Sequence, residues 1–367
     1  MGILYKEKKM ERFISIDSGK FATKVAEYSK EKDLVKKFNI RTKVSAGDFR
    51  DDAIEKNTYV VEMDGNVYKV GNGARGQGAE LITDKKTETH KICVLTVLAM
   101  LASSKEKDII NVAIGLPANE WANVSKRMDF KDYILPQGEV TIKIKKDSAS
   151  DVVSKTFTIG RRYVFPESIG ALFSDEMYNK VSPSTITGVI DIGNLNLNAT
   201  YWQGVELIMD KSVTADLGGA LLIQDLAQEL SSNIVSTDEM IAANILKSSE
   251  RALPMEFGVT KDQAEESKKV IKKVLLDHAK EVKRQCNSRK WSLDLMRIIA
   301  IGGTSKDIET ELKEVFSNIT VLDNSEYVNV LGFLRIMCAQ DPGVGKEINI
   351  SDMSKNNNEV KREKKAG

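Results

Sequence analysis

The chain has 367 residues, enough for two domains of ordinary size that each contain a hydrophobic core. Its 54 Lys and Arg balance 53 Asp and Glu, so the net charge of +1 creates no overall field that would attract DNA or a membrane. The three cysteines, Cys93, Cys286 and Cys338, lack paired or metal-type spacing, which favours buried thiols in a reducing cytosol.

The two ends of the chain are predicted to lie outside the fold. Residues 1–9 precede the first strand and lack the apolar core of a signal peptide. Residues 351–367 have almost no apolar content, so a disordered tail is expected there. Because no apolar run approaches the roughly 20 residues of a membrane span, we expect a cytoplasmic protein with no membrane partner.

The first strand runs from Arg12 to Asp17, ends in the turn Asp17-Ser18-Gly19-Lys20 and returns as a strand over 22–28, with a third strand over 33–41. A glycine in such a turn lets the backbone approach a phosphate, and an aspartate at the strand end can hold Mg²⁺ through water. An isolated Asp-x-Gly is more often a plain hairpin turn, so this motif alone carries little weight.

Residues 42–84 mix charged loops with short alternating strands, including a hairpin within 59–70, and are predicted to form an inserted subdomain. An apolar helix over 89–103 and a buried-type strand over 109–114 then return the chain to a parallel sheet. A further hairpin is predicted within 140–159.

An extended apolar run then leads into a helix, with Pro166 and Glu167 expected in its first turn and its end expected near Asn179. Considered alone, Glu167 at this place would only compensate the helix dipole. Residues 181–185 are rich in turn formers and indicate a link between two domains.

The second half repeats this plan. A strand over 187–192 ends in Asp191-Ile192-Gly193-Asn194, and strands are predicted over 197–201 and 205–210. The segment Leu217-Gly218-Gly219-Ala220 then opens a helix, and its paired glycines can present backbone near a nucleotide.

Residues 230–294 are predicted to form a second insertion, dominated by an amphipathic helix over about 262–289 whose charges make a solvated face. A buried-type strand is then predicted over 297–301, and Gly302-Gly303-Thr304-Ser305 follow it at the start of a helix. The bare backbone of such a strand-to-helix turn can contact a nucleoside and its α-phosphate. The segment 324–333 enters a late helix that contains a glycine suited to close packing.

In this order, five segments resemble the motifs of the actin-type ATPase superfamily. They are phosphate 1 at 14–24, connect 1 at 164–172, phosphate 2 at 189–198, adenosine at 298–305 and connect 2 at 327–333. Elements similar to those of the ParM/Alp-like branch, the bacterial plasmid-segregation actins, stand at 70–74, 84–91, 113–117 and 166–169. The resemblance covers most of the chain.

The resemblance implies an α/β fold of the actin/Hsp70 type, which is a duplicated ATPase fold with two domains around a nucleotide cleft and an inserted subdomain in each. Domain I is expected over 10–183, with its insertion at about 42–84, and is completed by a helix over about 329–347. Domain II is expected over 184–328, with its insertion at about 230–294.

The resemblance also implies a site for ATP, or alternatively GTP, with Mg²⁺. Glu167 would position or activate the attacking water, and Asp191 would share the catalytic role. Asp17 and Asp191 would hold Mg²⁺ through water. The residues expected to bind the nucleotide are Asp17, Ser18, Gly19, Lys20, Lys24, Gly193, Asn194, Leu195, Asn196, Gly218, Gly219, Gly302, Gly303 and Thr304.

A protein of this kind would be an ATPase whose hydrolysis is coupled to polymerisation. It would assemble with itself into a head-to-tail filament and drive plasmid DNA segregation through a small DNA-binding adaptor on a centromere-like site, without binding nucleic acid directly. The alternatives are a small-molecule kinase of the same superfold, for which no substrate base or sugar-binding loop is identified, and a host cytoskeletal or scaffold actin homologue.

Overall fold

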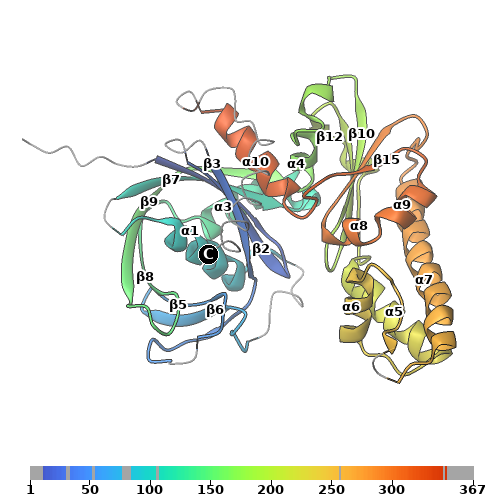
Figure 1. The fold of residues 1–367 in the computed structure, drawn as a ribbon. Coiled ribbons are helices and arrows are strands. Elements are labelled where there is room, and N and C mark those ends of the chain that lie inside the picture. Colours follow the sequence, from blue (N-terminus) through green and yellow to red (C-terminus); the bar gives the residue numbers. More distant parts are fainter. Residues whose placement is uncertain are drawn as a thin grey trace, which may run out of the picture. The chain divides into compact units, whose positions relative to one another are not determined.

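The computed structural model describes residues 11–29, 34–51, 54–76, 84–104, 107–255, 258–341 and 344. The extension predicted over 1–9 and the tail predicted over 351–367 lie outside these residues. The chain divides into two compact units (Figure 1). Unit 1 comprises the residues up to Asn179 and those from Asn329 on, and unit 2 comprises Lys180–Val328.

Among the described residues, unit 1 contains a nine-stranded sheet in the order β3-β2-β1-β7-β9-β8-β5-β6-β4. The strands are β1 (Glu11–Ser18), β2 (Ala22–Ser29), β3 (Leu34–Arg41), β4 (Val44–Ala46), β5 (Thr58–Met63), β6 (Asn66–Gly71), β7 (Asp108–Leu116), β8 (Gly138–Lys145) and β9 (Val153–Pro166). The predicted hairpins within 59–70 and 140–159 are confirmed as β5–β6 and β8–β9. The strands of the predicted insertion, β4 to β6, extend the same sheet.

The core of unit 1 is built around α1 (Glu88–Leu101), which lies within the curve of the sheet (Figure 1). Apolar side chains on all sides of this helix are buried, as expected for a helix that neighbours surround. The shorter helices of the unit are α2 (Ala118–Trp121), α3 (Val124–Ile134) and α4 (Ile169–Leu172), and α10 (Val328–Ala339) begins where the chain returns from unit 2. None of the described helices combines the length and apolar character needed to cross a bilayer.

Unit 2 has a six-stranded sheet over its described residues, in the order β12-β11-β10-β14-β15, with β13 paired to β11. Its elements are β10 (Ile186–Ile192), β11 (Leu197–Gln203), β12 (Glu206–Leu207), β13 (Val213–Ala215), α5 (Gly219–Asn233), α6 (Glu239–Lys247), α7 (Lys261–Ser288), β14 (Arg297–Ile301), α8 (Gly303–Asp307), α9 (Glu309–Val315) and β15 (Ile319–Val321). The predicted amphipathic helix is confirmed as α7, which starts at a capping box formed by Thr260 and Gln263.

The two sheets share one pairing pattern. In unit 1, β1 pairs antiparallel with β2 and parallel with β7. In unit 2, β10 pairs antiparallel with β11 and parallel with β14. The duplication predicted from motif order is therefore visible in the strand pairing, and it places Asp17 and Asp191 near the carboxyl ends of equivalent strands.

The helix predicted from Pro166 to Asn179 is wrong in extent, because Pro166 ends β9 and α4 is a single turn. The side chain of Arg335 donates to the carbonyl of Phe173 at 2.6 Å, which supplies a partner that a longer helix would have provided. Arg335 also pairs with the carboxylate of Asp175.

Two further predicted boundaries differ. The strand predicted over 205–210 is limited to β12, because Met209–Lys211 forms a 3₁₀ turn. The last helix ends at Ala339 rather than near 347. Pro342 explains this end, because proline disfavours the helical conformation of the residue before it and lacks a backbone N–H.

Candidate functional site

The first predicted phosphate turn is the tip of the β1–β2 hairpin. The backbone N–H of Gly19 donates to the carbonyls of Asp17, at 3.0 Å, and Ala22, at 3.1 Å. The hydroxyl of Thr42 donates to the carbonyl of Gly19 at 2.7 Å and so fixes the turn from outside. The Gly19 amide, expected on a phosphate, is therefore used to close the hairpin.

The second turn, between β10 and β11, is built in the same way. The N–H of Gly193 donates to the carbonyl of Asn196 at 2.9 Å. The start of α5 is joined to this turn, because the N–H of Gly219 donates to Gly193 O at 3.0 Å and that of Ala220 to Asn194 O at 2.7 Å. The N–H of Gly193, like that of Gly19, therefore closes its own hairpin.

The adenosine segment meets the same turn within unit 2. The hydroxyl of Thr304 donates to Gly193 O at 3.0 Å, and a Cβ placed on Gly219 would lie 2.5 Å from that hydroxyl oxygen. Gly302 has φ +93°, and a Cβ there would lie 2.7 Å from Asp191 Oδ1. Only glycine fits this backbone conformation beside the carboxylate.

The residues predicted in unit 2 thus converge at one place, where β10 ends. They are Asp191 at the end of β10, the turn residues Gly193, Asn194, Leu195 and Asn196, Gly218 and Gly219 at the start of α5, and Gly302, Gly303 and Thr304 at the start of α8. A Cβ on Gly218 would come within 2.5 Å of Asn194 O, so these segments approach each other through bare backbone.

In unit 1, the predicted residues Asp17, Ser18, Gly19, Lys20 and Lys24 lie along the β1–β2 hairpin, and Glu167 follows β9. A lysine that the sequence analysis did not select joins the two carboxylates of this group. The ammonium of Lys85 is 3.2 Å from Asp17 Oδ1 and also donates to Glu167 Oε1. All three side chains are buried, so the structure assembles a compact charged cluster of one cation and two anions.

This cluster shifts the ionisation of its members. Burial by itself raises the pKa of Asp17, but the charges of Lys85 and Lys24 and hydrogen bonds from Lys85 and Asn329 outweigh burial and lower it. At Glu167, burial raises the pKa and the charge of Lys85 opposes that rise only in part. Burial would lower the pKa of Lys85, but the two carboxylates raise it, so this lysine stays charged.

The backbone that follows Glu167 is strained. Ser168 has φ +71°, a left-handed conformation that costs a residue with a side chain about 1–2 kcal/mol. The N–H of Glu167 donates to Leu116 O at 2.8 Å, and the N–H of Ser168 donates to Asn329 Oδ1 at 3.0 Å. Strained residues of this kind are common at functional sites, where the surroundings hold them in place.

His90 lies near this cluster on α1. Its Nδ1 is 2.7 Å from the hydroxyl of Thr87, the residue that caps α1. Burial first, and then the positive charges of Lys85 and Lys20, lower its pKa to about 3. The imidazole is therefore neutral, and its ring is buried within unit 1.

Lys85 and Asn329 both lie in segments that carry the family resemblance, at 84–91 and 327–333, although neither was predicted as a site residue. Their contacts join positions far apart in the chain, and local sequence patterns contain no information on such contacts. Within the described residues, no cluster of three or more His, Cys, Asp and Glu side chains could hold a metal. Mg²⁺ does not require such a cluster, because it keeps several waters and binds one or two carboxylates together with phosphates.

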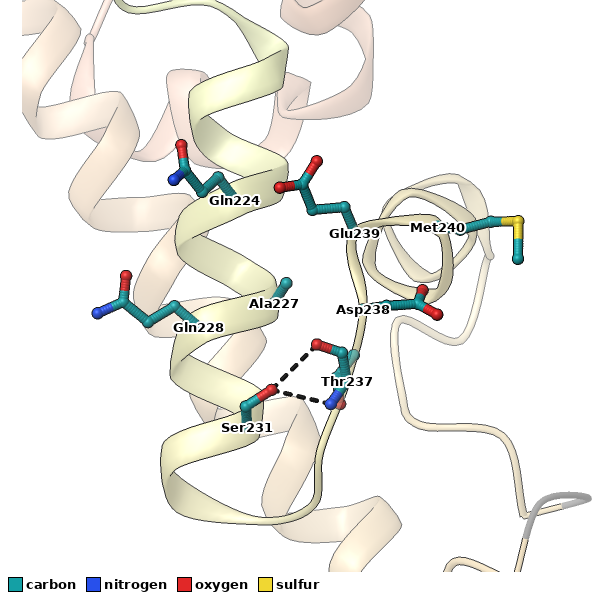
Figure 2. A pocket seen from close by; sticks show the side chains of 8 residues that line it. All are labelled: Gln224, Ala227, Gln228, Ser231, Thr237, Asp238, Glu239 and Met240. Atoms are coloured by element: carbon teal, nitrogen blue, oxygen red, sulfur yellow. Dashed lines mark hydrogen bonds between the residues drawn. The ribbon is translucent and has the colours of Figure 1, made fainter.

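A hollow between α5 and α6 lies elsewhere in unit 2 and contains none of the predicted site residues (Figure 2). Its polar atoms serve the local fold, since Ser231 Oγ accepts from Thr237 N at 2.8 Å and donates to Thr237 O at 3.0 Å. The carboxylate of Asp238 caps α6, and Gln224 and Gln228 point away from that helix in Figure 2. With carboxylates and no cation in its lining, this hollow is unsuited to a polyphosphate.

Comparison with known proteins shows which fold the chain has. Residues 15–170 match the family described as the N-terminal domain of actin-like proteins. Comparison with curated protein sequences found no match. The Alp12 filament structure has a TM-score of 0.67 and 22% identity, covering 90% of this chain and 99% of that chain.

Two other solved structures agree with this likeness. ParM of a 15-stranded filament from Clostridium botulinum has a TM-score of 0.62 and 19% identity, covering 89% of this chain and 99% of that chain. The archaeal actin homologue Ta0583 in complex with ADP has a TM-score of 0.65 and 14% identity, covering 88% and 98%. The chain therefore has an actin-like fold, as its motifs predicted, and its residues 15–170 are similar to the N-terminal domain of actin-like proteins.

Proposed function

We propose that this protein is a filament-forming bacterial actin that binds and hydrolyses ATP, or alternatively GTP, with Mg²⁺. The observation that carries this proposal is the equivalent placement of Asp17 and Asp191. Each is the second-last residue of an internal strand, beside a glycine turn that is closed by the same type of hydrogen bond. ADP in the complex of the archaeal actin homologue supports a nucleotide as the ligand.

The residues present fit a magnesium nucleotide. Gly302 and Gly219 bring backbone so close to Asp191 and Thr304 that a Cβ at either glycine would overlap their oxygens, so bare backbone would line the place where phosphate oxygens and a nucleoside bind. Asp17 and Asp191 would each offer a carboxylate to the hydration shell of Mg²⁺. When bound, the metal supplies positive charge that neutralises the phosphate oxygens.

Each half-site has a separate task in this proposal. In unit 1, Lys20 and Lys24 contribute positive charge to the phosphates, and Glu167 orients the attacking water and accepts its proton. The raised pKa of Glu167 suits a proton acceptor, and Lys85 holds its carboxylate in place. In unit 2, the residues gathered at the end of β10 bind the remainder of the nucleotide.

The assembly part of the proposal is supported by likeness to the Alp12 and ParM filaments. Subunits would join head to tail through a heterologous interface that does not close on itself, and hydrolysis would weaken that interface. The net charge of +1 favours an adaptor protein as the link to a centromere-like site on plasmid DNA rather than direct contact with DNA. Such a protein would work in the cytoplasm.

Sedimentation and light scattering test the proposal. The purified protein should pellet with Mg-ATP or Mg-GTP, and pelleting should be weaker with Mg-ADP and absent without nucleotide. Asp191→Asn should impair both pelleting and phosphate release, because it removes a carboxylate from the proposed metal shell. Phosphorylation of a sugar, with no scattering change under any of these conditions, would establish the kinase alternative instead.

A further inference from the structure

The first turn of α10 joins the two strand ends that carry the carboxylates of unit 1. Asn329 accepts a hydrogen bond from Ser168 N at 3.0 Å through its Oδ1. Its side chain also hydrogen-bonds to the carboxylate of Asp17, which requires the amide N–H as donor. Asn329 is only 7% exposed, so both bonds are shielded from water.

Neighbouring contacts fix the position of Asn329. The hydroxyl of Ser15, on β1, donates to Val330 O at 2.6 Å. A Cβ on Gly332 would lie 2.5 Å from Gly170 O, so α10 and α4 touch through backbone alone. The ring of Phe333 packs on that of Phe165, at 5.7 Å between centroids. The start of α10 is therefore held against both β1 and the end of β9.

We infer that Asn329 is a positioning residue that sets the geometry of Asp17 and Glu167 toward a bound magnesium nucleotide. The side-chain oxygen of Asn329 holds Ser168 in the left-handed conformation, and this conformation sets the direction of the preceding residue, Glu167. The side-chain N–H of Asn329 fixes the orientation of the Asp17 carboxylate. Asn329 itself touches no reacting atom, and the inference rests on the proposed function.

Lys85 does not make this second link redundant. It joins the side chains of Asp17 and Glu167, whereas Asn329 joins the Asp17 side chain to the backbone beyond Glu167. Lys85 balances the charge of the two carboxylates and holds one oxygen of each, whereas the short amide of Asn329, on a fixed helix, sets the direction of the Asp17 carboxylate and of the backbone beyond Glu167. Two carboxylates with separate tasks need both the Lys85 link and the Asn329 link, because small displacements of catalytic groups slow a reaction strongly.

Two variants separate the two bonds. Asn329→Ala removes both, while the nearly isosteric Asn329→Asp keeps the acceptor for Ser168 and replaces the donor beside Asp17 with a carboxylate. Asn318→Ala is the matched control, because Asn318 also donates two hydrogen bonds, to Leu293 O at 3.0 Å and Met296 O at 2.8 Å, and all three residues belong to unit 2. The readouts are amide hydrogen exchange at Ser168, kcat and KM for Mg-ATP, and the melting temperature.

In Asn329→Ala, Ser168 should exchange about tenfold faster, the effect of losing one hydrogen bond. Its kcat should fall on the order of 10- to 100-fold. Asn329→Asp should keep the slow exchange of Ser168 and most of kcat but raise KM by about tenfold, because like charges adjoin at the metal-binding carboxylate. Asn318→Ala should lower the melting temperature and change neither exchange at Ser168 nor kcat.

An unchanged exchange rate of Ser168 in Asn329→Ala would overturn the inference, and so would wild-type kcat and KM in both variants. If the alanine variant does not fold, the aspartate variant decides, because unchanged KM there contradicts a role at Asp17. Exchange is measured without nucleotide. Absence of hydrolysis in the wild type therefore refutes the proposed function, while the exchange data still test the link from Asn329 to Ser168.

Discussion

Lys24 lies directly opposite Asp17 in the antiparallel pairing of β1 with β2. Residues opposite each other in such a pair point to the same face of the sheet, so the ammonium faces the carboxylate. In unit 2, the equivalent residue opposite Asp191 is Asn198, whose Oδ1 accepts from the hydroxyl of Thr214 at 2.9 Å. The residue opposite the aspartate is thus a cation in unit 1 and a neutral amide in unit 2.

Lys24→Met should weaken nucleotide binding with little effect on the chemical step. Loss of one charge-assisted hydrogen bond to phosphate raises KM about tenfold or more. Phosphate release under saturating Mg-ATP should stay within a few-fold of wild type. Lys36→Met, at an exposed position on β3 of the same sheet, is the control, and an equal rise of KM in both variants would contradict a specific role for Lys24.

Glu167→Gln should separate assembly from turnover. The amide keeps the size of the side chain and an oxygen for Lys85 but cannot take a proton, so phosphate release should slow about 10- to 100-fold. Filaments should form with ATP and persist after those of the wild type disassemble. Parallel time courses of scattering and phosphate release measure this, with Glu139→Gln on the exposed face of β8 as control. Wild-type kinetics in Glu167→Gln would end its catalytic assignment.

Lys85→Met should destabilise unit 1, because two buried carboxylates lose their shared cation. Removing one member of a buried ion pair costs about 3–5 kcal/mol. Lys143→Met breaks an exposed pair with Glu62 and should cost about 0–1 kcal/mol. In a Glu167→Gln background, Lys85→Met should lower the free energy of unfolding by less than it does in the wild type. If urea unfolding gives the same decrease in both backgrounds, Lys85 and Glu167 are not coupled.

Gly302→Ala and Gly303→Ala form a matched pair of neighbours with opposite expectations. Gly302 has a positive φ and its Cβ would approach Asp191, so alanine should destabilise the protein by about 1–3 kcal/mol and weaken nucleotide binding. A Cβ on Gly303 meets no atom within 4 Å, so alanine there should be neutral or stabilise by about 0.4–1 kcal/mol. Melting temperatures that fall equally in both variants would argue against this account of the turn.

His278 predicts a loss of stability on acidification. Burial lowers its pKa to about 4 from 6.5, and Glu281 on the same helix opposes this shift only weakly. A depressed folded-state pKa means that the unfolded chain binds more protons between these values, so stability is present above pH 6.5 and falls as the pH decreases toward 4. By this linkage, the free energy of unfolding should drop by about 2 kcal/mol between pH 7 and 5 through His278 alone.

His278→Leu should remove this part of the pH dependence. Urea unfolding in a Trp121→Phe background would follow unit 2, because the other two tryptophans, Trp202 and Trp291, are buried there. An identical drop in the His278→Leu variant would show that other groups account for the acid sensitivity.

The fold was largely predictable because its signals are local. Apolar runs that end in Asp17 and Asp191 predict buried strands, and their glycine turns predict hairpins whatever the rest of the chain does. The motif order then supplied the duplication. Helix ends were less predictable, because the short α4 depends on Arg335, a residue more than 150 positions away.

The candidate site was predictable only in part, for the same reason. Nothing in the local sequence distinguishes Lys85 from its charged neighbours Asp84 and Lys86, because its partners lie 68 and 82 positions away. The sequence also could not show which backbone amides close the two hairpins. Gly19 and Gly193 stand in turns that resemble phosphate-binding turns, but their N–H groups donate to carbonyls of the same turns. Tertiary contacts decide such assignments.

The return of the chain to unit 1 at α10 sets an order of events during synthesis. The first part of unit 1 leaves the ribosome without Asn329 and Phe333, so its carboxylates lack their helix partner while all of unit 2 is translated. At the usual pace of translation this interval is on the order of ten seconds. Unit 2 is continuous in sequence and can complete its core first, so a nascent chain released before α10 would hold one finished half-site and one unfinished one.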